Sequence, residues 1–130
     1  KLDSVTVADY MTRDVTTLTP DMEMLAAIHL LIKNGYSGCP VVEHGKVIGL
    51  LSEKDCLKVA LVAGLEGTAA GTVREFMSSK VNSLEADTTI LTAATKFMDT
   101  PFKRYPVMQD GKLVGQISRS DVLRAIHDLS

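Results

Sequence analysis

Aromatic residues are scarce in this sequence, and basic residues are never concentrated. Among 130 residues there are three phenylalanines, three tyrosines and no tryptophan. Lysine and arginine total 14 against 16 aspartates and glutamates, and the resulting net charge of −2 is spread over both halves without a basic block. A surface for nucleic acid or for an anionic membrane needs concentrated positive charge. The sequence therefore argues against both partners.

Long hydrophobic runs are missing too. Charged residues or glycines interrupt every apolar run well before the roughly 18 residues that a membrane span needs, so we expect no membrane span. No secretory signal is visible, although the sequence begins at Lys1 and could be a fragment. The two cysteines, Cys39 and Cys56, lack a C-x-x-C spacing. Reduced thiols that act as small core residues in a cytoplasmic protein are the simplest interpretation.

Motifs of catalysis and metal binding are also absent. His29, His44 and His127 fall in three separate segments, and the sequence contains no H-E-x-x-H, no G-x-S-x-G and no P-loop. Nothing places a base beside Cys39 or Cys56, although the sequence alone leaves a Cys/His pair open. We therefore expect no catalytic residues, no metal site and no required cofactor. A small enzyme without a recognised motif is one of three functional hypotheses, and the missing motifs argue against it.

What the sequence does contain is an internal repeat. A shift of 66 residues aligns VADYMTRDVTTLTPD, which starts at Val7, with VREFMSSKVNSLEAD, which starts at Val73. The alignment continues without a gap to residue 60 against residue 126, and 15 of these 54 positions are identical. We expect one repeat over 5–62, a Gly- and Ala-rich linker over 63–71 and a second repeat over 72–128. Two copies are too few for a solenoid, so we expect one module packed about a pseudo-twofold axis.

Each repeat predicts the order β-α-β-β-α, an α/β (α+β) fold. A short extended piece, DVTTL or KVNSL, precedes Asp21 or Asp87, and we expect either aspartate to cap the next helix. The helix predicted over 22–32 is apolar almost all round, which favours deep burial. Its counterpart carries a single apolar stripe, formed by Ile90, Leu91, Ala93, Ala94, Phe97 and Met98. Gly35 ends the first of these helices and Pro101 the second.

A hairpin and a final helix complete each repeat. The segments CPVVEHGKVIGLL and YPVMQDGKLVGQI place two residues ending in glycine, at 44–45 and 110–111, between β-branched runs. Such pairs suit tight turns with positive φ. Gly49 and Gly115 lie in the second strand, where a side chain would block whatever approaches. The final helices are predicted to begin at about residues 53 and 119.

The sequence Gly-x-x-Ser-x-x-Asp joins each hairpin to its final helix. Ser52 can accept a hydrogen bond from a first-turn N–H, and Asp55 favours the positive end of the helix, so a helix cap accounts for both residues without a ligand. The whole pattern nevertheless recurs as GQISRSD, ending in Ser118 and Asp121. A cap does not explain the glycine, so the recurrence favours a paired site.

These residues resemble a known family. Tandem units with PVV…G…GLLSEKD and PVM…G…GQISRSD, each opening with YMT or FMS, are similar to the cystathionine-β-synthase-type (CBS) domain pair from about Val5 to His127. The resemblance implies a disc-like module with two clefts between the repeats. In that family the clefts commonly bind adenine nucleotides or S-adenosylmethionine and report to an attached enzyme, channel or transporter.

The resemblance also implies the residues of each cleft. In the family pattern the aspartate accepts hydrogen bonds from the ribose hydroxyls, the serine and the helix start face phosphate, and the partner repeat supplies the adenine wall. The first cleft would contain Val15, Thr16, Tyr36, Ser37, Gly38, Pro40, Ser118 and Asp121. The second would contain Ser52, Asp55, Val81, Asn82, Phe102, Lys103, Arg104 and Pro106.

The two clefts are not expected to be equal. Lys103 and Arg104 place two cations where the family often contacts phosphates, whereas the matching Ser37 and Gly38 place none. A ligand with several phosphates would therefore prefer the cleft with Asp55. Other interpretations stay open, because both cations suit a solvated surface, and Tyr36 and Phe102 suit a core as well as a pocket wall.

Two other functional hypotheses fit the sequence better than an enzyme does. The first is a regulatory module that binds AMP, ADP, ATP or S-adenosylmethionine and transmits occupancy to a fused or separate effector protein. The second is a ligand-free dimerisation scaffold with vestigial clefts. Each repeat has two helices with apolar faces, which also favours a homodimer.

Overall fold

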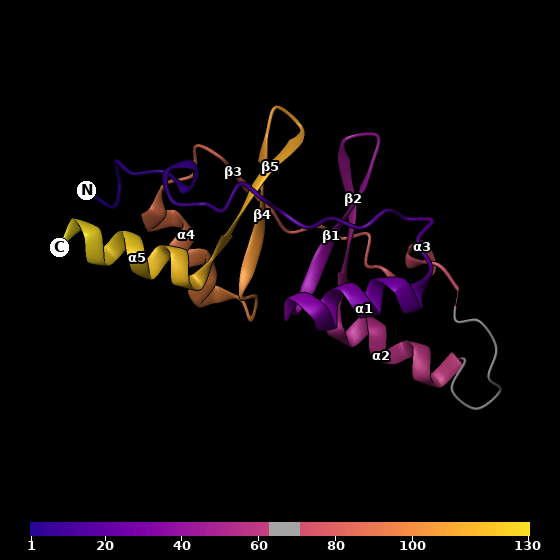
Figure 1. The fold of residues 1–130 in the computed structure, drawn as a ribbon. Helices are drawn as coiled ribbons and strands as arrows, with labels where there is room; N and C mark the ends of the chain where they lie inside the picture. The colour runs from indigo at the N-terminus through magenta and orange to yellow at the C-terminus, as the bar shows by residue number, and fades with distance from the viewer. Residues whose placement is uncertain (63–70) are drawn as a thin grey trace. The chain divides into compact units, whose positions relative to one another are not determined.

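The computed structural model describes residues 1–62 and 71–130. The predicted linker over 63–71 lies, apart from its last residue, outside the described residues. The chain divides into two compact units: unit 1 is Lys1–Val15 with Asn82–Ser130, and unit 2 is Thr16–Val81. The opening residues of each repeat therefore belong to the unit that contains the other repeat's hairpin, as the colours of Figure 1 show.

Unit 2 is built on the hairpin of strands β1 (Gly38–Glu43) and β2 (Lys46–Ser52). Helices α1 (Met24–Asn34) and α2 (Glu53–Val62) lie side by side against it, and the short helix α3 (Val73–Phe76) completes the unit (Figure 1). The turn residues at 44–45 have φ of 53° and 78°, so the predicted positive-φ turn is confirmed.

Unit 1 repeats this arrangement. Strand β3 (Leu84–Glu85) runs parallel to β4 (Arg104–Gln109), which pairs antiparallel with β5 (Lys112–Ser118). Helices α4 (Ile90–Asp99) and α5 (Arg119–Leu129) cover the sheet, and a 3-10 turn, η1 (Val7–Asp9), opens the unit. The predicted β-α-β-β-α order is confirmed here. In unit 2 the first strand is reduced to one parallel bridge, between Leu18 and Val41.

The opening segments are anchored by equivalent valines. Val7 is fully buried in the core of unit 1, and its N–H donates to the carbonyl of Thr88 at 2.7 Å. Val73 is fully buried in the core of unit 2, and its N–H donates to the carbonyl of Met22 at 2.9 Å. Each unit thus completes its core with the opening segment of the other repeat.

The hairpin glycines are required by these same opening segments. A Cβ added to Gly49 would lie 2.6 Å from the Sδ atom of Met77 and 2.7 Å from the carbonyl oxygen of Ser78. At Gly115 the corresponding distances, to Met11 and Thr12, are 2.6 and 2.8 Å. Real Cβ atoms do not approach so closely. The sequence predicted that something approaches these glycines, and the structure identifies it as the opening segment.

The predicted aspartate caps are wrong. The N-cap residues of α1 and α4 are Glu23 and Thr89, and the Thr89 hydroxyl accepts a hydrogen bond from a first-turn N–H. Asp21 and Asp87 lie instead in tight turns just before the helices, closed by N–H···O bonds across residues 19–22 and 85–88. Aspartate suits both settings, which is why its position misled.

The burial predicted for α1 is also wrong. Met24, Ala27 and Leu31 are buried, but Leu25 and Ile32 are 64% and 75% exposed. In α4 the predicted stripe is narrower than expected, because it buries only three residues of this set: Ile90, Ala93 and Phe97. Leu91 and Met98 of the predicted stripe are exposed. The apolar residues outside the buried stripe therefore lie on the outer face of each helix pair.

Candidate functional site

The Ser-x-x-Asp motif of unit 2 forms the junction between β2 and α2. The backbone N–H of Asp55 donates to Ser52 Oγ at 3.1 Å, and the backbone N–H of Ser52 donates to Asp55 Oδ2 at 3.0 Å. Two donors that the helix cannot satisfy are thereby paired reciprocally, which is a capping box. The expectation that these residues cap a helix is confirmed.

Unit 1 repeats this junction between β5 and α5. The N–H of Asp121 donates to Ser118 Oγ at 3.2 Å, and the N–H of Ser118 donates to Asp121 Oδ2 at 2.9 Å. The Ser118 hydroxyl also lies 2.9 Å from that of Ser120. The hydroxyl and one carboxylate oxygen of each motif are thus held by the backbone, which fixes their positions.

Asp55 and Asp121 are the buried charged side chains of the described residues, only 8% and 6% exposed. The Oδ1 atom of each accepts a hydrogen bond from a cation three positions later on the helix: Lys58 Nζ at 3.2 Å in unit 2 and Arg124 Nη1 at 3.1 Å in unit 1. A carboxylate offers about four acceptor positions. These hydrogen bonds occupy one position on each oxygen, so each oxygen can still accept another hydrogen bond.

The segment before β1 lies against the start of α2 in the same unit. Gly38 pairs with Ser52 across the hairpin, and the carbonyl of Ser37 accepts a hydrogen bond from Glu53 N–H at 2.9 Å. Just before it, the hydroxyls of Tyr36 and Thr16 lie 3.3 Å apart. Tyr36 is half-buried and packs against the core of unit 2, so its side chain serves that core.

The matching segment of unit 1 is held by a side chain as well as by the backbone. Lys103 carbonyl accepts from Arg119 N–H at 3.1 Å, and Arg119 Nε donates to the carbonyl of Phe102 at 3.1 Å. Arg119 also donates to the carbonyl of Thr100 at 3.3 Å. The ring of Phe102, 39% exposed, forms a T-shaped pair with the ring of Tyr105 at a centroid distance of 5.7 Å. Unit 2 has Glu53 at the position of Arg119, so only unit 1 carries this clamp among the described residues.

The remaining predicted residues lie on the strands and in the segments that lead into the two units. Pro40 and Pro106 are buried in β1 and β4, opposite Leu50 and Gln116. The half-buried residues are Val15, Val81, Asn82 and Arg104. Within one unit the structure brings Ser52 and Asp55 together with Ser37 and Gly38, and Ser118 and Asp121 together with Lys103 and Arg104. The predicted clefts combine residues from both units, and their assembly stays a prediction.

The two cysteines differ in burial. Cys39 is buried and Cys56 is half-buried. Burial, followed by the nearby carboxylates of Asp55 and Glu53, raises the pKa of the Cys56 thiol. A raised pKa keeps the thiol protonated, whereas a nucleophile needs the thiolate.

Across residues 1–62 and 71–130, no three His, Cys, Asp or Glu side chains are grouped so that they could hold a metal ion. In the same part of the chain, no helix has both the length and the apolar character needed to cross a membrane.

Sequence reasoning missed Lys58, Arg119 and Arg124. The first and last of these belong to the pattern Asp-x-x-Lys/Arg, a spacing of three that brings side chains together on a helix. That signal was readable from the sequence. The role of Arg119 was not, because its carbonyl partners lie 17 and 19 residues earlier.

Both halves of the chain match one family of known proteins. The family model of the CBS domain matches residues 7–62 and again residues 73–128. The chain belongs to the CBS domain family. Among solved structures, CBSX2 of Arabidopsis thaliana in complex with AMP superposes with a TM-score of 0.82 at 28% identity, covering 96% of this chain and 98% of that one.

Curated relatives of this CBS pair include longer proteins. The chain is 35% identical to zinc metalloprotease MJ0392 of Methanocaldococcus jannaschii over 95% of its own length but only 32% of that protein. It is 32% identical to MJ0188 of the same organism, of which it spans 44%. With MJ1426, also from that organism, it shares 30% identity over 82% of each chain. The chain therefore spans less than half of the first two relatives.

Proposed function

We propose that this CBS pair is a regulatory module that binds AMP, ADP, ATP or S-adenosylmethionine in clefts between its two repeats. The observation that carries the proposal is the paired Ser-x-x-Asp junction, which buries a carboxylate at a helix start in both units. Support also comes from CBSX2, a relative in structure and sequence whose crystal structure contains AMP. Occupancy is transmitted to a fused or separate effector protein in the cytoplasm. The repeats over 5–62 and 72–128, with the linker over 63–71, act as one module.

The aspartates supply the recognition of ribose. Each carboxylate oxygen retains an acceptor position beyond its capping or salt-bridge contact, so two ribose hydroxyls can each donate to one oxygen. The first N–H groups of α2 and α5 favour an anionic phosphate nearby. The first proposed cleft comprises Val15, Thr16, Tyr36, Ser37, Gly38, Pro40, Ser118 and Asp121. The second comprises Ser52, Asp55, Val81, Asn82, Phe102, Lys103, Arg104 and Pro106.

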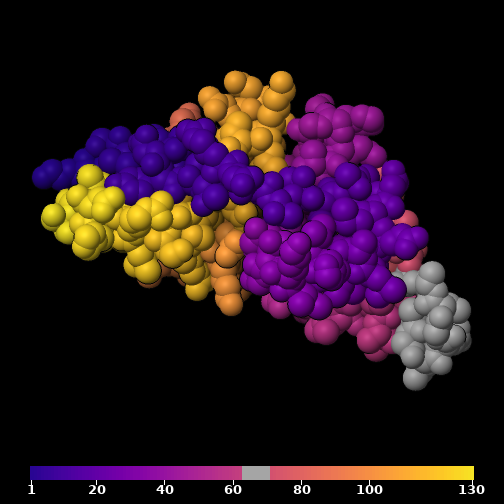
Figure 2. Space-filling model, viewed as in Figure 1, coloured from indigo at the N-terminus to yellow at the C-terminus, as the bar shows by residue number. Residues whose placement is uncertain are grey.

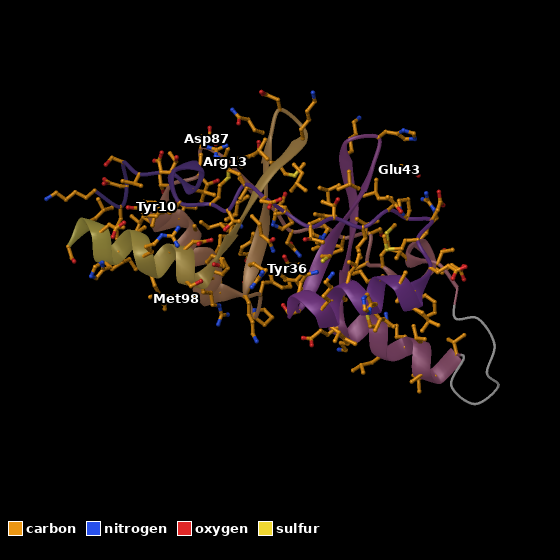
Figure 3. The ribbon with its side chains drawn as sticks, viewed as in Figure 1. Tyr10, Arg13, Tyr36, Glu43, Asp87 and Met98 are labelled. Carbon is orange, nitrogen blue, oxygen red and sulfur yellow. The ribbon has the colours of Figure 1, made fainter. Side chains whose placement is uncertain are left out.

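Calorimetry with the four compounds tests this proposal. Asp55→Ala and Asp121→Ala should each weaken binding at their own cleft tenfold or more, because a charged hydrogen bond contributes about 1.5 to 3 kcal/mol. Asp55→Asn and Asp121→Asn keep an acceptor for the capping box and separate binding from helix stability. Asp87→Ala, which removes an exposed carboxylate in a turn (Figure 3), is the matched control. Equal affinity for ATP and 2′-deoxy-ATP would remove the ribose role.

The two clefts should differ in their response to phosphate. Lys103 is exposed and Arg104 is half-buried, and both belong to the proposed Asp55 cleft. Lys103→Ala should weaken the binding of ATP more than the binding of adenosine, since a surface cation contributes to affinity mainly by contacting phosphate. Lys33→Ala, which removes an exposed cation from the last turn of α1, provides a control. Equal losses for ATP and adenosine would contradict the assignment.

A second candidate function, a ligand-free dimerisation scaffold, is favoured by the exposed apolar residues. The helices of unit 2 expose Leu25, Ile32, Leu57, Leu61 and Val62, between 59% and 84% each. Those of unit 1 expose Leu91, Met98, Leu123, Ile126 and Leu129, between 38% and 87%. Met98 projects from α4 in Figure 3. Exposed apolar patches of this kind commonly mark interaction surfaces, so we propose a homodimer for either function.

Light scattering separates the two functions when it is combined with calorimetry. Ile32→Glu should shift the chain toward monomer, whereas Lys46→Glu, an exposed change at the turn end of β2, should not. A monomer at high concentration would contradict the homodimer. A dimer that binds none of the four compounds at millimolar concentration would favour the scaffold.

A further inference from the structure

Arg124 joins the Asp121 carboxylate to the opening segment of unit 1. Its Nη1 atom donates to Asp121 Oδ1 at 3.1 Å, and its Nη2 atom donates to the carbonyl of Tyr10 at 3.0 Å. The guanidinium also lies over the Tyr10 ring, 5.6 Å from its centroid. A planar fork with several donors can make such contacts simultaneously, which a lysine ammonium on a flexible stem does less well.

Tyr10 is fastened to α5 at a second point. Its hydroxyl donates to Asp128 Oδ2 at 3.1 Å, one helical turn beyond Arg124. Figure 2 shows the opening residues, in indigo, lying along the C-terminal helix, and Figure 3 shows Tyr10 over that helix. Two residues later, Thr12 exchanges backbone hydrogen bonds of 2.8 Å with Gln116. The segment from Tyr10 to Thr12 is thus bound to the helix and strand that carry Ser118 and Asp121.

Unit 2 fastens its opening segment without involving the motif. The Lys58 ammonium bonds Asp55 at one point, and Phe76, at the position of Tyr10, offers no hydroxyl. The segment is held by backbone hydrogen bonds of 2.9 Å between Ser78 and Leu50, and its side-chain tie is a 2.6 Å ion pair between Arg74 and Glu43 of β1. Glu43 lies at the turn end of the hairpin, and Ser52 lies at the opposite end. Arg74 is therefore a natural control for Arg124.

We infer that Arg124 is a positioning residue that couples ligand binding at Asp121 to the docking of the segment Tyr10–Thr12. This inference rests on the proposed function of Asp121 as a ribose acceptor. Arg124 holds one position on Oδ1, which orients the carboxylate and directs its free position toward a ribose hydroxyl. A ligand that fixes the carboxylate also fixes the guanidinium, and this strengthens the hydrogen bond from Arg124 to the Tyr10 carbonyl. By reciprocity, a change that loosens the segment also weakens the binding of the ligand.

The test uses AMP as the probe in an Asp55→Asn background, in which Asp121 is the intact site carboxylate. Calorimetry gives the affinity, and amide hydrogen exchange at Thr12 gives the docking of the segment. With Arg124 present, AMP should slow exchange at Thr12. Arg124→Lys, which reproduces the contact of Lys58, should weaken AMP binding by about threefold to tenfold. It should also remove the slowing of Thr12 exchange that AMP causes in the Arg124 chain. It should also raise the exchange rate at Thr12 without ligand.

Control variants separate coupling from general stability. Arg74→Lys should leave AMP affinity and Thr12 exchange unchanged. Tyr10→Phe keeps the carbonyl and the ring, so the ligand-dependent slowing should persist. Equal slowing in the Arg124→Lys chain, or an equal loss of affinity in Arg74→Lys, would overturn the inference while leaving the ribose role intact. Absence of AMP binding to the unaltered chain would overturn the ribose role for AMP and the inference with it.

Discussion

The two units share one fold but fasten their opening segments in different ways. In unit 2 the segment is tied to the hairpin by Arg74 and Glu43, far along β1 from the Ser-x-x-Asp junction. In unit 1 the tie runs through Arg124 to the buried carboxylate itself. Two units with the same fold can therefore tie the opening segment to different partners: Arg124 connects it to the motif carboxylate in unit 1, whereas Lys58 contacts the carboxylate of unit 2 and Arg74 ties the segment to the hairpin.

What the units share is the contact between glycine and methionine, and breaking it should have the largest effect. Gly49→Ala and Gly115→Ala each place a methyl group within 2.8 Å of a sulfur atom and a carbonyl oxygen. We expect each to lower the free energy of unfolding by about 3 kcal/mol, at the upper end for overpacked sites. Urea unfolding measures the loss. Adding Met77→Ala to Gly49→Ala should recover only part of it, since the Ser78 carbonyl is backbone; full recovery would contradict this account.

The exchanged valines should give the next largest effect. Val7→Ala and Val73→Ala each remove two methyl groups from a fully buried site, which costs about 2 kcal/mol. Hydrogen exchange should report the loss in the other repeat: in residues 82–130 for Val7→Ala and in residues 16–62 for Val73→Ala. If each substitution loosened only its own repeat's hairpin, the exchange of segments would be wrong.

These results show which features a single sequence encodes locally. The turns at 44–45 and 110–111 and the helix starts at Ser52 and Ser118 were predictable, because every determining residue lies within a few positions. The pairing of opening segments was not, since Val7 and Val73 are identical and either repeat could accept either valine. The glycine of Gly-x-x-Ser-x-x-Asp had suggested a ligand, yet it contacts a segment far away in the sequence.

Loss of the capping aspartates should have a smaller effect, and it should be unequal in the two units. Asp55→Ala removes a capping box and one lysine contact, and we expect a loss of about 1 kcal/mol. Asp121→Ala also frees Arg124, whose bond to Tyr10 then lacks its counterion, so the loss should be greater by several tenths of a kcal/mol. Urea unfolding of both variants tests the order. A larger loss of unfolding free energy for Asp55→Ala would contradict this order and would show that the aspartate of unit 2 contributes more to stability.

The smallest effect is expected at high pH, from Tyr10 of unit 1. Burial, followed by the hydrogen bond to Asp128, raises the pKa of Tyr10 above its usual value of 10.0. Because folding favours the protonated phenol, its contribution to stability is complete below pH 10.0 and is lost as pH rises through the folded-state pKa. Chemical denaturation from about pH 9 to 11 should therefore show a steeper decline for the unaltered chain than for Tyr10→Phe. Phe76→Tyr, the reciprocal change in unit 2, should not add a comparable slope, because Val62 stands at the position of Asp128 and offers no carboxylate to the new hydroxyl.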